Sequence, residues 1–274
     1  MMTPSLQAAC PRRLGWLVGL LLCGLLSAAA LLLSLRSWDI SLFNLLNNLG
    51  RALPLGAEFI THLADYRWTS PLLIILLAQQ PRLLAAALLS ALFIHFSVHE
   101  FKHYFQVLRP CYAPHLAGQV FTAGPRLNID SFSFPSGHSA TASLIAVALV
   151  VVGGGRALIP ALLFALAVAA SRAMLGAHFP SDTAAGLALG LGISSGVFYL
   201  MSRPQAWPQS RQGAARVSAL VGLLAAGLLI FILQEGQHTY PFWFAAASKI
   251  TCLAALGVLL WRQGRRILKR SNSA

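Results

Sequence analysis

Residues 134–182 read FPSGHSATASLIAVALVVVGGGRALIPALLFALAVAASRAMLGAHFPSD. Two apolar runs in this stretch, 134–152 and 157–175, flank a short turn of glycines and one arginine. As α-helices of about 19 residues each they would be roughly 28 Å long, which matches a hydrocarbon core of about 30 Å. The stretch therefore predicts two membrane-spanning helices joined by a tight turn, with polar residues gathered at their two far ends.

The rest of the chain has the same character. Of its 274 residues, 57% are hydrophobic and only 10% are charged, against about 25% charged residues in a typical soluble domain. This composition excludes an ordinary cytosolic protein and a disordered one. We predict an all-α polytopic membrane bundle with about eight crossings. The predicted crossings are 14–35, 71–78 with an N-terminal extension, 83–103, 134–152, 157–175, 183–201, 217–233 and 241–261.

The first run, 14–35, has a second interpretation. Ala28 and Ala30 resemble a signal-peptide cleavage site, but the run is longer than the apolar core of about 7–15 residues in a signal peptide. We therefore expect an uncleaved first helix whose N-terminus lies inside.

Residues 36–70 carry a different pattern. Leu42, Leu45 and Leu49 recur at helical spacing and alternate with asparagines, which predicts one apolar stripe and one polar face. Such a helix would lie on the outer membrane surface. A plain loop is the alternative.

The charge balance fixes an expected orientation. The chain has 20 Lys and Arg against 7 Asp and Glu, for a formal net charge of +13. A basic soluble protein would suggest a nucleic-acid partner, but most of these cations flank the predicted crossings on one side, as cytoplasmic residues do. We expect no nucleic-acid partner, both termini in the cytoplasm, and a location in the inner (plasma) membrane. The four cysteines show no metal-binding spacing.

Three polar groups fall on connections that this topology places outside. Lys102 and Arg109 are seven residues apart, or two helical turns, so both would point the same way while the helix lasts. The other two groups lie at the start of the fourth crossing and between the fifth and sixth. The candidate site residues are Lys102, Arg109, Ser136, Gly137, His138, Arg172, His178 and Asp182.

These residue types suit a phosphate ester. Three fixed cations and the free N–H groups of a helix start would bind phosphoryl oxygens. His178 lies four residues before Asp182, whose carboxylate could fix the imidazole tautomer and leave the other nitrogen free to attack. His138 could donate a proton to the leaving oxygen. We expect neither a metal nor another cofactor.

Together, Lys102-x6-Arg109-Pro110, Pro135–His138 and Ser171-Arg172-x5-His178-x3-Asp182 resemble the three-part signature of the type 2 phosphatidic acid phosphatase (PAP2) superfamily. The resemblance covers about 83–199 and implies a six-helix core, so the last two crossings are additions. It also implies that His178 forms a phosphohistidine, that Asp182 orients it, and that His138 protonates the leaving group. The remaining five candidate residues would hold the phosphoryl oxygens.

We therefore expect residues 1–202 to form a phosphatase core with its signature at 102–182. Residues 203–274 would add a basic cytoplasmic loop, two helices and a basic tail. The expected activity is hydrolysis of a lipid phosphate monoester or pyrophosphate at the periplasmic or outer face. Candidate substrates are undecaprenyl pyrophosphate, which we favour, phosphatidylglycerophosphate, phosphatidic acid and a lipid A phosphate. A lipid phosphotransferase and a non-catalytic lipid-binding or transport protein are the alternatives, and the oligomeric state stays open.

Two further features lie outside the signature. His95, His99 and His103 recur every four residues beside Glu100. This spacing can bind zinc, but we expect the stripe to face the site and to form hydrogen bonds there or to contact lipid headgroups. Arg126 and Asp130 could contact the substrate or each other.

Overall fold

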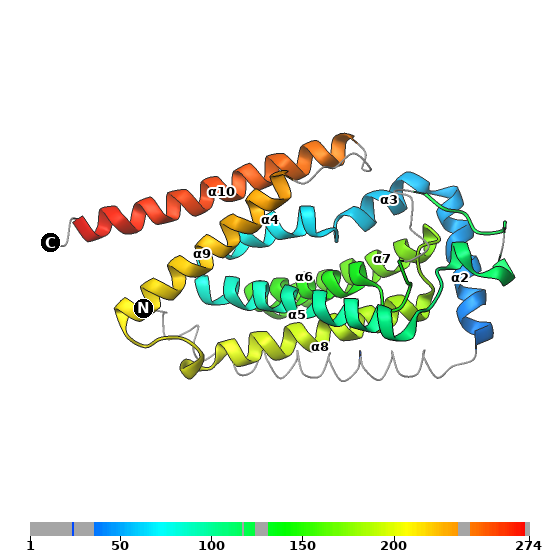
Figure 1. Cartoon of the computed structure of the whole chain (residues 1–274), viewed down its shortest axis with the longest axis horizontal. Coiled ribbons are helices and arrows are strands. Elements are labelled where there is room, and N and C mark those ends of the chain that lie inside the picture. The colour runs from blue at the N-terminus through cyan, green and yellow to red at the C-terminus, as the bar shows by residue number, and fades with distance from the viewer. Residues whose placement is uncertain (1–23, 25–35, 117, 124–130, 235–241, 272–274) are drawn as a thin grey trace. The chain divides into compact units, whose positions relative to one another are not determined.

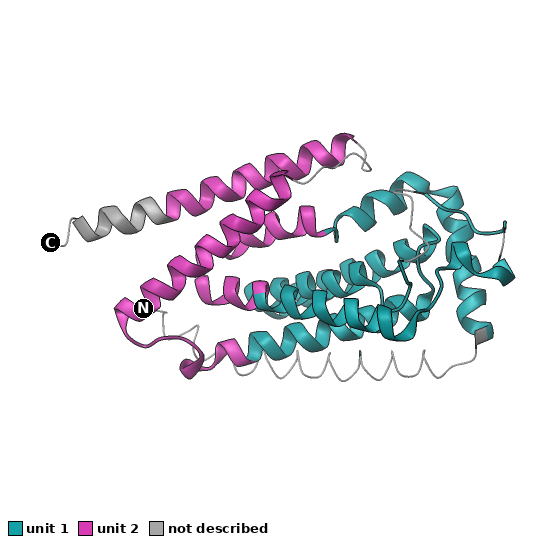
Figure 2. Cartoon of the chain, in the orientation of Figure 1, with its two compact units in different colours: residues 1–65, 89–199 teal, residues 66–88, 200–274 magenta. Residues whose placement is uncertain are grey.

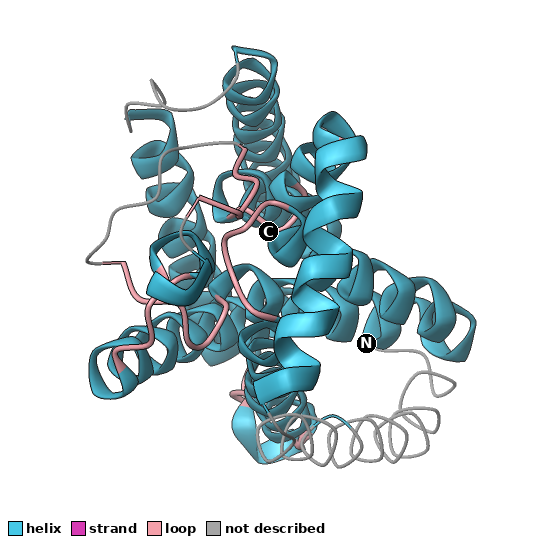
Figure 3. Cartoon of the chain, turned by 90° about the vertical axis from the view of Figure 1, so that its right-hand side faces the viewer, coloured by secondary structure: helices cyan, strands magenta, loops and turns pink. Residues whose placement is uncertain are grey.

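The computed structural model describes residues 24, 36–116, 118–123, 131–234 and 242–271. Within these ranges the chain is helical and contains no β-strand (Figure 3). The all-α fold class is therefore confirmed. The first predicted crossing, apart from Gly24, lies outside the described residues, as do Arg126 and Asp130.

The chain divides into two compact units (Figure 2). Unit 1 consists of residues 1–65 and 89–199, and unit 2 of residues 66–88 and 200–274. The helices α5 and α8 each pass from one unit into the other. All eight predicted site residues belong to unit 1.

Unit 1 is a bundle closed at one end by shorter helices. Figure 1 shows α5, α6, α7 and α8 running in a common direction, with α2 crossing one end of them. The helices are α2 (Arg36–Ala52), α3 (Pro54–His62), α5 (Pro81–Phe105), α6 (Gly137–Gly153), α7 (Leu158–Met174) and α8 (Pro180–Ser202). A 3-10 turn, Gly154–Ala157, joins α6 to α7, which is the tight turn that the sequence predicts.

Glycines let α8 approach α6 at backbone distance. A Cβ at Gly186 would lie 2.3 Å from the carbonyl oxygen of Ser136, and one at Gly190 would lie 2.2 Å from that of Ala140. Only a residue without a side chain fits at such a separation. Because the two glycines are one helical turn apart, they bring the start of α8 against the start of α6.

The helix α2 confirms the amphipathic prediction for its segment. Leu45 and Leu49 are exposed while Phe43 is buried against Ala113, Leu116 and Ala173. Asn47 is buried too, because its side-chain amide donates to the carbonyls of Phe121 and Met174 at 2.8 and 3.2 Å. The helix is thus fixed to the bundle by one face and presents its leucine stripe on the other.

A carboxylate also fastens α2 to α8. The backbone N–H and the hydroxyl of Ser181 donate to the two oxygens of Asp39 at 2.9 and 2.6 Å. Asp39 therefore stabilises the first turn of α8, where an anion is favoured.

Five helical segments in the described part of the chain are long and apolar enough to cross a membrane. They are 81–116, 137–174, 180–202, 211–234 and 242–262. Residues 137–174 include two predicted crossings, since they contain both α6 and α7. The second predicted crossing corresponds to α4 (Tyr66–Leu77), a 12-residue helix of about 18 Å, shorter than a hydrocarbon core.

Unit 2 contains α4, α9 (Arg211–Gln234) and α10 (Phe242–Ser271). The helix α10 packs against both α4 and α9. The Ser248 hydroxyl on α10 donates to the backbone carbonyl of Arg67 on α4 at 3.0 Å. The two C-terminal helices, α9 and α10, therefore pack together with α4 as one unit.

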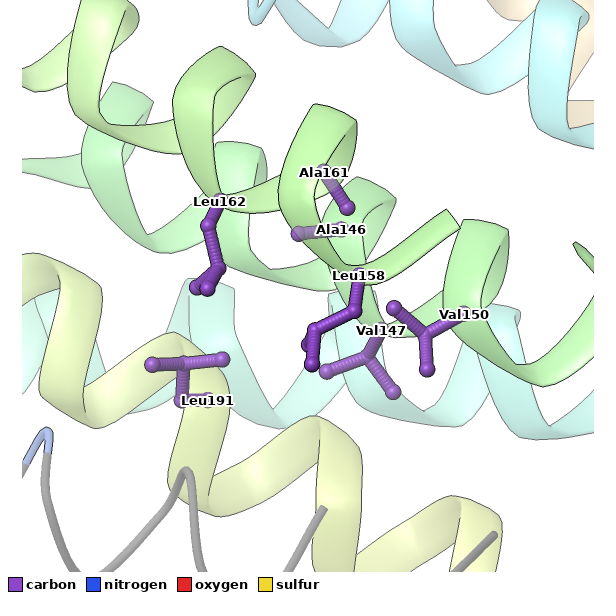
Figure 4. Close-up of a pocket in the computed structure, with 7 residues that line it drawn as sticks. All are labelled: Ala146, Val147, Val150, Leu158, Ala161, Leu162 and Leu191. Carbon is purple, nitrogen blue, oxygen red and sulfur yellow. The ribbon is translucent and has the colours of Figure 1, made fainter. Parts of the chain in front are cut away.

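A small cavity between α6, α7 and α8 is lined only by apolar side chains (Figure 4). The lining residues are Ala146, Val147, Val150, Leu158, Ala161, Leu162 and Leu191. No group in this lining could bind a phosphate, so the candidate site lies elsewhere.

Candidate active site

The start of α6 organises one side of the site. Ser136 is the N-cap residue, and its buried hydroxyl accepts from the N–H of Ser139 at 3.4 Å. The N–H of Ser136 donates to the carbonyl of Asp182 at 3.0 Å. Gly137 begins the helix, as the sequence predicts, and its N-terminal N–H groups are of the kind that bind anions.

His178 and Asp182 come together, but not through a direct hydrogen bond. Their nearest atoms, Nδ1 and Oδ2, are 3.9 Å apart. The hydroxyl of Ser133 lies between them, 3.2 Å from Nδ1 and 2.5 Å from Oδ2. The expectation of a carboxylate bonded directly to the imidazole is therefore corrected. Because α8 begins at Pro180, His178 precedes the helix and does not lie one regular turn before Asp182.

Burial and cations act together on His178, which lies in the connection between α7 and α8. Burial is the largest cause of a pKa well below the ordinary 6.5, and the charges of Arg109, Arg172, Lys102 and His138 lower it further. The imidazole is consequently neutral at pH 7, the state in which a nitrogen lone pair can attack.

Arg109 lies beside the nitrogen of His178 that faces away from Ser133. Its Nη1 is 3.3 Å from Nε2 of His178 and donates to the carbonyl of Ala177 at 2.9 Å. Its Nη2 donates to the hydroxyl of Ser131 at 2.7 Å, and its Nε donates to the carbonyl of the same residue. A buried cation is thus held next to an imidazole lone pair.

Lys102 and Arg109 do not share a helix face. The helix α5 ends at Phe105, Gln106 has a φ of 47°, and Arg109 is extended because it precedes a proline. The same-face expectation was wrong at this point. The two cations instead come together on one segment of the chain. Lys102 donates to the carbonyl of Phe132, and Arg109 donates to the hydroxyl of the neighbouring Ser131.

The third cation and the second histidine meet residues from α3 and its C-terminal turn. Arg172 Nη1 donates to the hydroxyl of Thr61 at 2.7 Å. Nε2 of His138 is 4.0 Å from Oδ2 of Asp65, a buried carboxylate. The region therefore contains a buried carboxylate as well as the cations.

Comparisons with known proteins identify one similar family. Residues 82–206 match the family model of the PAP2 superfamily. This part of the chain contains all eight candidate site residues, so the resemblance inferred from the three motifs is confirmed.

Two solved structures resemble this chain. The crystal structure of a transmembrane PAP2 type phosphatidylglycerolphosphate phosphatase from Bacillus subtilis is 25% identical, with a TM-score of 0.50, and the match covers 68% of this chain and 93% of the other. The crystal structure of Aquifex aeolicus LpxE is 27% identical, also with a TM-score of 0.50, over 59% and 94% of the two chains. A search of curated proteins gives no significant match. The chain is a multi-pass membrane protein with a PAP2-like fold.

Sequence reasoning missed three side chains near the PAP2 motifs, Ser133, Thr61 and Asp65. Ser133 is in the same run as the second motif, three residues before Ser136, so proximity could have suggested it. Thr61 and Asp65 lie far from any motif along the chain. For Asp65, only the scarcity of acidic residues in the sequence offered a signal.

The histidine stripe lies on an exposed face of α5. His95, His99 and His103 are all exposed, and the rings of His99 and His103 are 4.4 Å apart. The ring of His103 also lies 6.2 Å from that of Phe132, whose carbonyl accepts from Lys102. Hydrogen bonding of the stripe at the site and contact with lipid headgroups both stay predictions. Among the described residues, no group of three or more His, Cys, Asp or Glu is arranged to hold a metal ion.

Proposed function

We propose that this protein is a metal-independent lipid phosphatase that works through a phosphohistidine. One observation carries the proposal: the buried Arg109 guanidinium lies 3.3 Å from Nε2 of His178. A cation that binds a phosphoryl oxygen at this position would bring the phosphorus next to the nitrogen that attacks it.

The reaction then has two steps. Nε2 of His178 attacks phosphorus, the bond from phosphorus to the leaving oxygen breaks, and His138 gives that oxygen a proton. In the second step His138 takes a proton from water, and the resulting hydroxide cleaves the phosphohistidine to release inorganic phosphate. After the second step, both imidazoles are back in their starting protonation states.

Five residues would bind and neutralise the phosphoryl group. Lys102, Arg109 and Arg172 supply fixed positive charge, and Ser136 and Gly137 supply the start of α6. This set provides the charge stabilisation that Mg²⁺ provides in many phosphoryl-transfer enzymes. It supports a reaction that needs no cofactor.

The membrane-embedded fold supports a lipid as the substrate. A polyprenyl pyrophosphate is our favoured substrate, with phosphatidylglycerophosphate, phosphatidic acid and a lipid A phosphate as the other candidates. The similar Bacillus subtilis protein is a phosphatidylglycerolphosphate phosphatase by its description, which supports a lipid rather than a soluble phosphate ester.

The decisive experiment is phosphate release from a panel of these lipids in detergent, with His178→Ala as the matched control. We expect one lipid to be hydrolysed and the variant to be inactive and to form no phosphoenzyme. Turnover by His178→Ala, or no turnover of any phospholipid or polyprenyl phosphate, would refute the proposal. Transfer of phosphate to an added lipid acceptor would indicate the phosphotransferase instead.

We also propose that the site faces the periplasm or outside and that both termini are cytoplasmic. In a variant without the native cysteines, Tyr104→Cys on the exposed end of α5 should react with a membrane-impermeant thiol reagent in intact cells. Gln205→Cys, in the exposed basic connection after α8, should react only after permeabilisation. The reverse result would invert the topology.

A further inference from the structure

Ser133 occupies a position that the PAP2 signature does not assign. It is completely buried, and its backbone N–H donates to the carbonyl of Val107 at 2.7 Å. Lys102 donates to the carbonyl of Phe132, the residue before Ser133, and Arg109 donates to the hydroxyl of Ser131. The Ser133 hydroxyl is therefore fixed between His178 and Asp182.

The direction of each hydrogen bond follows from donor and acceptor chemistry. An ionised carboxylate only accepts, and Oδ2 of Asp182 already accepts from the N–H of Phe179 at 2.8 Å. The Ser133 hydroxyl must therefore donate its proton to Asp182. Its oxygen then faces Nδ1 of His178 with lone pairs alone, so Nδ1 carries the ring proton.

The other side of the ring leads to the same tautomer. Nε2 of His178 faces Nη1 of Arg109 at 3.3 Å, and a guanidinium can only donate. Nε2 therefore presents a lone pair. Two independent neighbours, a hydroxyl on one nitrogen and a guanidinium on the other, select one form of the imidazole.

We propose that Ser133 is the positioning residue through which Asp182 orients His178, and that it holds the ring with its proton on Nδ1 and its lone pair on Nε2. This inference rests on the proposed function of His178 as the nucleophile. Asp182 has no direct hydrogen bond to the imidazole, and the Ser133 hydroxyl makes that contact.

A double-mutant cycle tests the relay through the rate of phosphoenzyme formation. Ser133→Ala should slow this step by about 10- to 100-fold, because it leaves two buried polar groups without their shared partner. Asp182→Asn should slow it as well. Since Asp182 works through Ser133, the double variant should be little slower than the slower single variant.

Ser143→Ala is the matched control. Ser143 is also buried, and its hydroxyl donates to the carbonyl of Leu187 at 2.9 Å, away from the site. Ser143→Ala should form the phosphoenzyme at the wild-type rate. If Ser133→Ala is poorly folded, Ser133→Cys takes its place, and its rate should lie between those of wild type and Ser133→Ala. Multiplicative losses in the cycle, or an unchanged rate in Ser133→Ala, would overturn the relay. Absence of phosphohistidine in the wild-type protein would instead overturn the proposed function.

A separate observation concerns His138, the proposed proton donor. Asp65 is a buried carboxylate, 4% exposed, and its Oδ2 lies 4.0 Å from Nε2 of His138. A carboxylate at this distance favours the protonated form of an imidazole.

The backbone holds Asp65 in this position. Its N–H donates to the carbonyl of His62 at 3.0 Å in the turn that ends α3. We infer that Asp65 is a positioning residue that stabilises protonated His138 while it donates to the leaving oxygen. No proton passes to Asp65, since His138 gives its proton to the leaving oxygen and regains one from the attacking water. This inference also rests on the proposed function.

Two substrates separate this role from a structural one. Asp65→Asn should slow hydrolysis of the lipid by about 10-fold or more, but it should have little effect on a nitrophenyl phosphate, whose leaving group needs no proton. Glu58→Gln is the matched control, because Glu58 is a carboxylate on the preceding helix, α3, that lies 3.9 Å from His62 instead. It should match wild type on both substrates.

Equal losses on both substrates in Asp65→Asn, or no loss on either, would overturn the role of Asp65. If His138→Ala itself failed to discriminate between the two leaving groups, the acid role of His138 would be wrong. In that case the proposed mechanism fails before Asp65 is considered.

Discussion

The close approach of Gly186 on α8 to Ser136 at the start of α6 gives a sharp test of how the site is built. At Gly186 a methyl group would lie 2.3 Å from the carbonyl oxygen of Ser136, whereas ordinary contacts begin at 3.4 Å. In a Gly186→Ala variant, either α8 or the start of α6 must therefore move by about 1 Å. Ser136 caps α6 and bonds to Asp182, so this movement separates parts of the proposed site.

The displacement predicts two magnitudes. Overpacking costs about 1–3 kcal/mol, offset by up to about 1 kcal/mol because alanine favours a helix more than glycine does. A misplacement of about 1 Å in an active site can cost about 100-fold in rate. Gly186→Ala should thus lower kcat strongly while it lowers the free energy of unfolding only modestly.

The assay compares kcat on the lipid substrate with the thermal unfolding temperature of the same detergent-purified protein. Gly196→Ala is the matched control, since it lies on the same helix and a Cβ there meets nothing within 4 Å. This control should keep wild-type kcat and be no less stable than wild type. A Gly186→Ala variant with wild-type kcat and unfolding temperature would refute the close packing of α8 on α6.

Three further predictions concern the chemistry. His138→Ala should lose about 10²–10⁴-fold on a lipid but much less on a nitrophenyl phosphate, as general acid catalysis requires; equal losses would make His138 a phosphate ligand. The acid limb of kcat/KM should lie below pH 6.5, because the pKa of His178 is lowered from that value and the neutral nucleophile persists at lower pH. The same lowered pKa means that stability is fully present above pH 6.5 and falls below it, as protonation favours the unfolded chain; an acid limb above pH 6.5 would contradict this environment. Activity should survive EDTA in full, measured as phosphate release; loss in EDTA with rescue by Zn²⁺ would instead implicate a metal site.

Hydropathy predicted most of the bundle because a membrane helix is encoded locally. The segments that became α6, α7, α8 and α9 are continuous apolar runs, and each needs only its own sequence to reveal it. The amphipathic α2 was also predictable from its leucine spacing. The short α4 was harder to define, since its apolar run is only part of a helix that begins at Tyr66.

The geometry of the site was less predictable because its key contacts are not helical. Spacing along a chain encodes direction only while a helix continues, and α5 ends before Arg109 reaches the site. Ser133 enters from an extended segment, and Asp65 from a turn nearly forty positions upstream of Lys102. No periodicity connects such residues, so only the folded chain reveals that they are neighbours.

The cations therefore have a structural task as well as a chemical one. Lys102 and Arg109 donate to the carbonyls of Phe132 and Ser131, and through them they fix Ser133 against His178. A guanidinium has five donors in a rigid fork, and Arg109 uses it to contact the 131–133 segment, the carbonyl of Ala177 and the ring of His178 at once. A lysine at this position could not make this set of contacts, because its single ammonium lacks the fork. The proposed mechanism thus requires this arginine for the orientation of His178 as much as for the charge of a bound phosphate.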